Sequence, residues 1–439
     1  MKMRRTPKQA HLRRPSSDGA SSGGPELLRE VNARRVLRLL RLHGPCSRAD
    51  LVRYSGLSAP TISSGVSYLE KRSLVEAMGP AASNGGRPPH LLRFNSGLGC
   101  VVGVDIGTRV VRVALADLNG SIIEEWVAAT NHHTRPERVA KLITASIRKL
   151  QARHKVPSKK LLALAAGVPG ITDARAGVVL SAPNLSSGWQ AVPLGQMLER
   201  QTGIATLVEN DVNLAALGES WSGTARGVPN FVFLTIGTGV GAGIFVDGHL
   251  YRGSDWAAGE IGYLYVPGTE EAPLEIRRPG SLEGILGEPG IRRAWRRLSN
   301  HHGRAGQAKA GNLSATEIFD LAEQGESHAR AVLERTARIL ADAITNVCVI
   351  LNSSLVVFGG RVGSHAGLFE ATRRIVERNE FCRPRLAPSA LGAKASLSGA
   401  IWLALARAES KILPSALPAA GIPGPGPDRS LLPAFLALR

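Results

Sequence analysis

The sequence predicts an α/β protein in which a small winged helix-turn-helix precedes a larger region of alternating strands and helices. The first observation behind this prediction is a run of three short helical patterns, followed by two strand patterns that flank a glycine- and proline-rich loop. The second is a change of pattern at Gly99, after which strands alternate with longer helices, as in α/β folds. At 439 residues the chain exceeds what one hydrophobic core usually organises, so we expect two or three domains.

The first two helices are predicted from apolar spacing and from capping residues. Apolar residues recur at helical spacing from Glu26 to His43, and Gly44-Pro45 ends this helix. Ser47 is of a type that caps helices, and it precedes a short helical pattern that runs through Tyr54.

The third helix is predicted to be the one that reads DNA. The turn Gly56-Leu57-Ser58 precedes it, Ser58 caps it, and it runs to about Lys71 with Pro60 in its first turn. Apolar residues at helical spacing face inward, and small polar residues suited to a major groove face outward. The inward residues are Ile62, Val66 and Leu69, and the outward ones are Thr61, Ser63, Ser64, Ser67, Tyr68 and Lys71.

Two short strands, Val75 to Gly79 and Pro89 to Phe94, are predicted to flank a wing at residues 83–88. Arg87, between glycine and proline, is placed at its tip and is expected to reach into a minor groove. Residues 26–95 thus read as a DNA-binding domain. Its expected DNA contacts are Arg48, Arg53, Ser58, Thr61, Ser63, Ser64, Ser67, Lys71 and Arg87.

The net charge supports a polyanionic partner for this domain. Residues 1–95 hold 17 lysines and arginines against 6 aspartates and glutamates, and so carry +11 of the net +19. Clustered positive charge is typical of nucleic-acid binding, although a solvated basic tail would look the same by charge alone. Residues 1–25, rich in Arg, Ser, Gly and Pro, are predicted to form a disordered basic arm.

The region after Gly99 reads as strands separated by helices. A strand meander is followed by the helix Pro136 to His154, and a glycine-linked hairpin comes later in the chain. The predicted strands are Cys100 to Asp105, Val110 to Asp117, Ser121 to Val127, Leu161 to Val168, Ala205 to Glu209, Phe231 to Thr235 and Gly241 to Val246. Residues 414–439, rich in Pro and Ala, are predicted to be a disordered tail.

Membrane insertion and secretion are not indicated by the sequence. No apolar run approaches the roughly 20 residues that cross a bilayer, and the basic N-terminus lacks an apolar signal stretch. The four cysteines show no metal or disulfide spacing, so a reduced cytoplasmic location is expected.

Several motifs together resemble the ROK family, which groups sugar-responsive repressors with sugar kinases. The resemblance covers roughly Asn32 to Ala408 and rests on "SRADLVRYSGLSAPTISSGVSYLE", "GVDIGT", "SAPNL", "VENDVNLAALGE", "LTIGTGVGAGIFVDGHLYRG", "AGEIGY" and "VVFGGRVG". It implies a two-lobed RNase H-like, actin-like sugar-kinase fold over residues 96–413. The implied lobes are about 96–225 and 226–392, with a C-terminal helix, 393–413, returning to the first lobe.

The resemblance also implies a sugar pocket between the lobes. The resemblance places the Asn210-Asp211 pair at its centre; the alternative role for either side chain is to cap the following helix. The implied sugar-contacting residues are Asn184, Asn210, Asp211, Glu260, Tyr263 and Glu283. Asp211 would act as a general base only if the protein were a kinase.

Two glycine turns distinguish a kinase from a regulator. The first, with Asp105, Gly107 and Thr108, has one glycine where family kinases have two in succession. Phosphoryl transfer depends on positioning of the phosphate and magnesium, which this shortened turn should do less well, so kinase activity is not expected. The second turn keeps the glycines that let backbone amides approach a phosphate, and is interpreted as a structural hairpin. The residues of this second vestigial turn are Gly237, Thr238, Gly239 and Gly241.

No cofactor or metal is expected. Many ROK proteins have a histidine and a cysteine-rich zinc loop after the pocket glutamate, but here Tyr263 stands at the histidine position. Ser281 stands at the last cysteine position, and Leu274 and Ile276 align with the other two, so no soft zinc ligands remain.

The sequence therefore predicts a cytoplasmic regulator, most simply a repressor of carbohydrate genes, that binds an inverted-repeat operator in double-stranded DNA as a homodimer or tetramer. A sugar or sugar derivative would be its effector. Two alternatives stay open: a sugar kinase that retains a DNA-binding domain, and a ligand-independent DNA-binding factor with a vestigial pocket.

Overall fold

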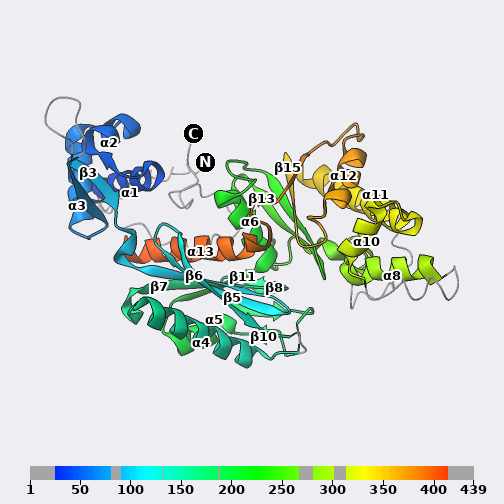
Figure 1. The fold of residues 1–439 in the computed structure, drawn as a ribbon. Coiled ribbons are helices and arrows are strands. Elements are labelled where there is room, and N and C mark those ends of the chain that lie inside the picture. Colours follow the sequence, from blue (N-terminus) through cyan, green and yellow to red (C-terminus); the bar gives the residue numbers. More distant parts are fainter. Residues whose placement is uncertain are drawn as a thin grey trace, which may run out of the picture. The chain divides into compact units, whose positions relative to one another are not determined.

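The computed structural model describes residues 25–80, 90–131, 133–185, 188–265, 280–300 and 313–413 (Figure 1). The predicted tail, the tip of the predicted wing and all but Pro25 of the predicted arm lie outside these residues. The chain divides into two compact units, and the break falls between Phe94 and Asn95.

The first unit is a three-helix domain with a small antiparallel sheet, as predicted. Its strands pair in the order β1-β3-β2. The helices are α1 (Pro25–His43), α2 (Arg48–Ser55) and α3 (Ala59–Glu70), and the strands are β1 (Cys46–Ser47), β2 (Val75–Pro80) and β3 (His90–Phe94).

The predicted caps of this unit are confirmed. Ser47 and Asp50 form a capping box at the start of α2, and Gly56 ends that helix in the left-handed region, at φ 67°. Ser58 caps α3 by accepting a hydrogen bond from the backbone N–H of Thr61. The inward residues Ile62, Val66 and Leu69 of α3 are fully buried.

The second unit begins with a five-stranded sheet whose strands run in the order β11-β7-β4-β5-β6. The first three strands in sequence form an antiparallel meander, and β7 and β11 pair parallel on the other side. Helices α4 and α5 cover one face and α13 covers the other (Figure 1). The bounds are β4 (Cys100–Ile106), β5 (Val110–Asp117), β6 (Ile122–Ala129), α4 (Pro136–His154), β7 (Leu161–Val168), α5 (Leu194–Thr202), β11 (Thr206–Asn210) and α13 (Ala395–Ile412).

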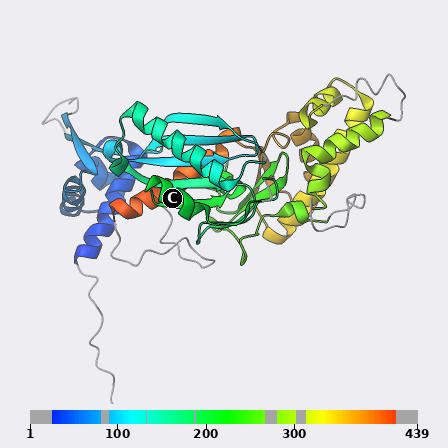
Figure 2. The ribbon, with the colours of Figure 1, turned by 90° about the horizontal axis from the view of Figure 1, so that it is seen from below.

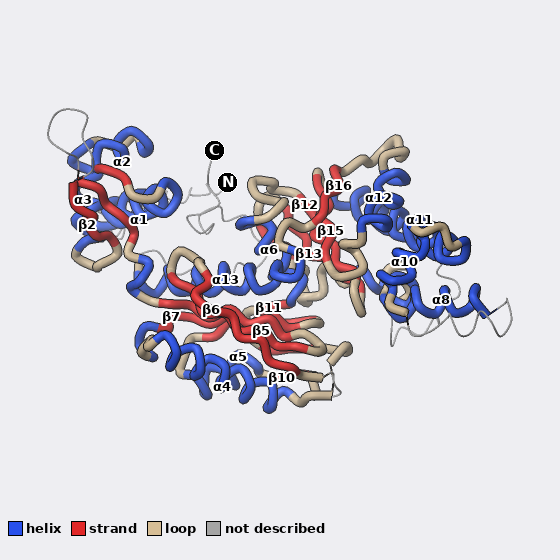
Figure 3. Tube along the Cα trace, in the orientation of Figure 1, coloured by secondary structure: helices blue, strands red, loops and turns tan. Residues whose placement is uncertain are grey.

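A second five-stranded sheet repeats this arrangement, in the order β14-β13-β12-β15-β16 (Figure 3). It too combines an antiparallel meander with two parallel strands, which gives the two-lobed sugar-kinase-like architecture. Its strands are β12 (Phe231–Ile236), β13 (Val240–Val246), β14 (His249–Tyr251), β15 (Leu355–Gly359) and β16 (Arg385–Pro388).

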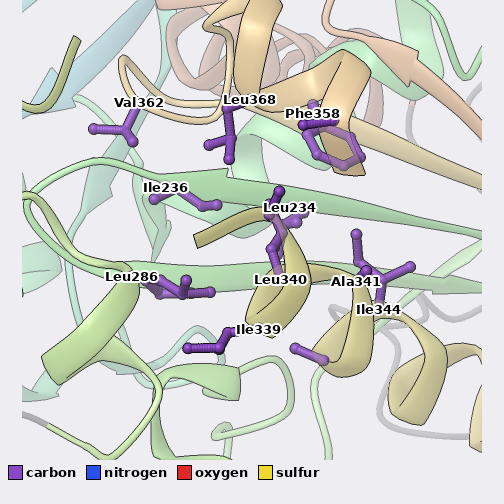
Figure 4. Packing of buried hydrophobic residues seen from close by; sticks show 14 of the residues in the cluster. Leu234, Ile236, Leu286, Ile339, Leu340, Ala341, Ile344, Phe358, Val362 and Leu368 are labelled. Atoms are coloured by element: carbon purple, nitrogen blue, oxygen red, sulfur yellow. The ribbon is translucent and has the colours of Figure 1, made fainter. Parts of the chain in front are cut away.

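Helices pack on both faces of the second sheet. Helix α6 (Asp211–Ser222) contacts β12 and β13 on one face. The long helix α11 (Ser327–Leu351) covers the other, where Leu340 and Ile344 pack with Leu234 (Figure 4). The remaining helices of this lobe are α7 (Glu283–Leu286), α8 (Glu288–Asn300), α10 (Ala315–Glu323) and α12 (Ala366–Val376), seen from below in Figure 2.

A small three-stranded sheet lies between β7 and α5 in sequence. Its strands are β8 (Ile171–Asp173), β9 (Val178–Ser181) and β10 (Gln190–Val192), and they pair antiparallel in the order β10-β9-β8. Among the described residues, no helix is both long enough and apolar enough to cross a membrane.

The strand predicted at Ala205 to Glu209 lies one residue later, at Thr206–Asn210. Asn210 pairs with Val168 as the last strand residue and also caps α6, because its side chain accepts a hydrogen bond from the N–H of Asn213. The chain therefore turns from strand to helix within one residue, which puts Asp211 in the first turn of α6.

Helices α6 and α13 pack with their backbones in contact. A Cβ added at Gly399 would lie 1.8 Å from the carbonyl oxygen of Leu214, and one added at Gly218 would lie 2.4 Å from that of Ala395. Only glycine at both positions permits this approach. The packing fixes α6, and with it Asp211, against the helix that covers the first sheet.

We predict that Gly399→Ala destabilises the protein by about 2 kcal/mol or more, although alanine usually favours a helix. The added methyl group would meet backbone atoms that cannot move aside. Ser398→Ala, at the adjacent half-buried position, adds no volume and serves as the control in urea or thermal unfolding. Equal midpoints for the two variants would show that the helices separate at little cost.

Candidate functional site

The outward face of α3 presents small polar side chains, as predicted. Ser63, Ser64 and Ser67 are exposed, whereas Thr61 is half-buried and shares a hydrogen bond of 2.8 Å with the hydroxyl of Ser58. Lys71 is exposed directly after the helix. This face can therefore enter a groove with little steric obstruction.

The two predicted phosphate-contacting arginines of α2 are paired with acids. Arg48 lies 3.1 Å from Glu70, and Arg53 lies 2.5 Å from Asp50. Both pairs are largely exposed, so their ion pairs contribute little and can be exchanged for phosphate contacts. Arg87 lies outside the described residues.

The N-terminus of α6 forms the centre of the predicted ligand pocket. Asn210 is held by structural hydrogen bonds: its Oδ1 accepts from the N–H of Asn213, and its Nδ2 donates to the carbonyl of Gly170 over 2.9 Å. The Oδ1 of Asp211, in contrast, accepts a hydrogen bond from the N–H of Val212, the next residue of α6. The capping role thus belongs to Asn210, and the Asp211 carboxylate keeps acceptor capacity for a ligand.

Asn184 and Glu283 meet at the second glycine turn. A Cβ added at Gly239 would lie 2.6 Å from Oε2 of Glu283 and 3.0 Å from Nδ2 of Asn184. The same Glu283 oxygen accepts a hydrogen bond of 2.9 Å from the N–H of Val240. Side chains from both lobes therefore converge on one point.

Burial and mutual repulsion raise the pKa values of the pocket acids. Burial, with added repulsion from Asp105 and Glu260, raises the pKa of Asp211 to about 7. Burial also raises the pKa of Glu260, with repulsion from Glu283, and the pKa of Glu283 itself. Such acids gain from a ligand that donates several hydrogen bonds, as a polyhydroxylated molecule does.

Tyr263 is 47% exposed and ends a short 3-10 helix, Ile261–Tyr263, that follows Glu260. Of the three other positions aligned with zinc ligands, Ser281 is described, whereas Leu274 and Ile276 lie outside the described residues. The described part of the chain contains no group of three or more His, Cys, Asp or Glu residues arranged to hold a metal ion.

The two glycine turns form tight bends at strand ends. In the first, the N–H of Gly107 donates to the carbonyl of Val110, and Thr108 is half-buried between them. In the second, the N–H of Gly237 donates to the carbonyl of Gly239 over 2.9 Å, across Thr238. A Cβ added at Gly241 would press on Val212 of α6, at 3.3 Å, so this glycine serves helix packing.

Asp105 of the first turn is engaged by protein groups. Its Oδ1 accepts a hydrogen bond of 2.8 Å from the hydroxyl of Ser396, and its Oδ2 lies 3.7 Å from the guanidinium of Arg112. Burial raises the pKa of Asp105, while Ser396 and Arg112 lower it. Arg112 was not predicted as a neighbour of Asp105, because the alternation of apolar and polar residues in β5 does not reveal which cation faces that carboxylate.

An ion pair that was not predicted from the sequence joins the two lobes near Asp211. Glu209, at the end of β11, is buried and accepts a hydrogen bond of 2.7 Å from Nε of Arg252, which follows β14. The motif containing Asn210 and Asp211 includes Glu209, but its partner is 43 positions away in sequence. Only the fold brings the two together.

A third missed group is Glu219 near the end of α6, which is fully buried. Its carboxylate accepts hydrogen bonds from the N–H of Thr224, the N–H of Leu391 and the hydroxyl of Ser389. Thr224 lies on the connection from α6 to β12, and Ser389 and Leu391 lie on the connection from β16 to α13. One carboxylate therefore ties both crossings between the lobes.

The raised pKa of Asp211 predicts a pH-dependent stability. A carboxyl group whose pKa rises from 3.8 to about 7 on folding binds its proton more tightly in the folded state. Its contribution therefore favours folding at acidic pH and is lost as pH rises from about 4 to 7.

We predict that Asp211→Asn stabilises the ligand-free protein at pH 8 by a few kcal/mol, at about 1.4 kcal/mol per pKa unit, and by clearly less at pH 5, where only part of the contribution has been lost. Thermal unfolding at both pH values measures the effect. Asp255→Asn, on the exposed part of a neighbouring loop, is the control and should follow the wild-type profile. A variant no more stable than wild type at pH 8 would contradict the assigned burial.

Comparisons with known proteins agree with this architecture. The family model described as "ROK family" matches residues 101–407. A xylose repressor of Caldicellulosiruptor bescii is 28% identical over 82% of this chain and 90% of its own length. A glucokinase of Halalkalibacterium halodurans is 32% identical over 69% of this chain and 94% of its own length.

A solved structure described as a ROK family transcriptional regulator, a homologue of the Escherichia coli MLC protein, shares the fold. It matches with a TM-score of 0.73 and 23% identity, over 88% of this chain and 99% of its own. The repressor and this solved structure each align with a larger fraction of the chain than residues 95–439 make up, so both alignments extend into the first unit. With the family model matching more than half of its residues, this chain belongs to the ROK family.

Proposed function

We propose that this chain is a cytoplasmic transcriptional regulator, most simply a repressor of carbohydrate uptake or metabolism genes, whose operator binding responds to a sugar or sugar derivative. The observation that carries the proposal is the presence in one chain of an exposed DNA-reading helix face and a pocket of convergent acids. A relative named xylose repressor, whose match extends into the first unit, supports it.

On the DNA side, Ser63, Ser64 and Ser67 would contact base edges in a major groove. The exposed cations Arg48, Arg53 and Lys71 would bind phosphates, and Arg87 would enter an A·T-rich minor groove. Serine hydroxyls discriminate bases weakly, so a homodimer or tetramer reading two spaced half-sites of an inverted repeat would supply much of the specificity.

On the ligand side, Asp211, Glu260 and Glu283 would accept hydrogen bonds from sugar hydroxyls, and the amide of Asn184 would donate one. Asn210 would orient this group through its cap, and Tyr263 would add a phenolic donor at the pocket edge. With tyrosine and serine at positions where many relatives have zinc ligands, we propose that no zinc is required and that the effector differs from the common hexoses.

We also propose that the protein does not phosphorylate its ligand. The carboxylate of Asp105 accepts a hydrogen bond from Ser396 and lies beside the guanidinium of Arg112, which supports this proposal because phosphoryl transfer depends on groups that position the phosphates and a divalent cation. The similarity to a glucokinase keeps the kinase alternative open to test, with Asp211 as general base.

We predict that the triple variant Ser63→Ala, Ser64→Ala, Ser67→Ala binds its operator about tenfold or more weakly. Three lost hydroxyl contacts at about 0.5–1.5 kcal/mol each account for this loss. Genomic fragments selected by the tagged protein supply the site, and mobility shifts measure affinity. The salt dependence should be unchanged because phosphate contacts remain.

Ser410→Ala, an exposed serine on α13, is the matched control. Equal affinity of the triple variant and wild type for the selected sites would contradict the recognition-helix assignment. Absence of any sequence-selective binding by wild type would contradict the regulator itself.

We predict that one member of a panel of pentoses, hexoses and amino sugars raises the melting temperature of the wild type and changes its operator affinity. Asp211→Ala should lose both responses while binding ligand-free operator normally. ADP release with ATP, Mg²⁺ and each sugar should stay at background.

Sugar-dependent ADP release that Asp211→Asn abolishes would instead establish a kinase. A melting temperature indifferent to every sugar would favour a ligand-independent DNA-binding factor.

A further inference from the structure

Glu209 is a buried carboxylate that pairs with Arg252 through one oxygen and accepts hydrogen bonds from the start of α6 through the other. Glu209 is 1% exposed, and the side chain of Arg252 is 12% exposed. Oε2 of Glu209 accepts from Nε of Arg252 over 2.7 Å. Oε1 accepts from the N–H of Asn210 over 2.9 Å and from Nδ2 of Asn213 over 3.0 Å. One oxygen therefore holds the start of α6, and the other holds a cation.

The two residues come from different lobes. Glu209 is the fourth residue of β11 in the first sheet and precedes Asp211 by two positions. Arg252 directly follows β14, the edge strand of the second sheet. The pair thus crosses between the lobes at the level of the pocket and not at the chain crossings that Glu219 holds.

Arg252 also begins the loop that carries Glu260. The N–H of Ala258 donates to the carbonyl of Arg252 over 3.2 Å, which closes the loop on itself. The N–H of Ala242 donates to the carbonyl of Gly259 over 2.8 Å, and a Cβ added at Gly259 would lie 1.9 Å from the carbonyl oxygen of Ala242. Arg252 therefore anchors one end of the loop that carries Glu260, and the backbone of β13 anchors the other.

We propose that Arg252 and Glu209 are positioning residues that set the spacing between Asp211 on α6 and Glu260 on the second lobe, and thereby the affinity of the pocket for its ligand. The inference rests on the proposed function of this pocket. Asp211 and Glu260 are close enough to repel each other, so in the absence of a ligand they tend to separate. The buried ion pair opposes that separation through attraction in a region of low dielectric constant.

A purely structural ion pair would behave differently when removed. Deleting one partner of a buried pair leaves an uncompensated charge and destabilises any protein, so a single deletion cannot decide the matter. Removing both charges together avoids this penalty. The double variant Glu209→Gln, Arg252→Met keeps side-chain length at both sites and is expected to fold.

The first test is amide hydrogen exchange, followed by mass spectrometry, on the ligand-free double variant. We expect the amides of residues 253–260 to exchange about tenfold faster than in wild type, because the loss of one local contact shifts the local opening equilibrium by about this factor. Exchange in α11 should be unchanged. The control Arg373→Met removes ion pairs within α12 and should match wild type. Unchanged exchange in the loop, or equally faster exchange throughout the lobe, would overturn the proposal.

The second test is the affinity for whichever sugar of the panel stabilises the wild type. We expect the double variant to bind this sugar about tenfold more weakly than wild type, and its operator affinity without sugar to stay within about twofold of wild type. The single variant Arg252→Lys keeps the positive charge and should bind the sugar more tightly than the double variant does. Sugar affinity within about twofold of wild type in the folded double variant would overturn the proposal. If the wild type binds no sugar, the proposed function fails, and the exchange experiment alone decides whether the pair positions the loop.

Discussion

The close packing of α6 against α13 is the constraint on which the second unit depends. Gly218 and Gly399 let the two backbones touch, and a side chain at either position would collide with a carbonyl group. Because α13 covers the first sheet while α6 also packs on the second, this contact unites the two lobes. It also fixes the N-terminus of α6, where Asn210 caps the helix and Asp211 faces the pocket.

Buried carboxylates mark both ends of α6, and each is satisfied in a different way. Glu209 at the start is paired with Arg252, whereas Glu219 near the end is held by hydrogen bonds from both chain crossings. Asp211, between them in sequence, has no ion pair among the residues that the structure describes, and burial raises its pKa to about 7. The donors of the described residues therefore engage the carboxylates that join the lobes more fully than they engage Asp211.

The arrangement around Asp105 explains how a kinase fold can serve regulation. The two glycine turns close tight bends between strands, and Gly241 leaves room for α6 to pack on β13. The carboxylate beside the first turn, however, is occupied by Ser396 and Arg112. The proposed use of ligand binding for regulation, in place of phosphoryl transfer, is consistent with an acid engaged in this way.

Local patterns determined much of this protein from the sequence alone. The capping serines Ser47 and Ser58, the turn at Gly56 and the inward face of α3 follow from contacts within a few residues, so their prediction was confirmed. The strand order, the backbone contact at Gly399, and the contacts of Glu209 with Arg252, Asp105 with Ser396 and Glu219 with Leu391 join segments tens to hundreds of residues apart. No local pattern encodes which distant group faces a buried carboxylate, because that depends on how whole sheets and helices pack. The tertiary structure alone therefore decided which of these buried carboxylates are paired with a cation or with distant backbone donors.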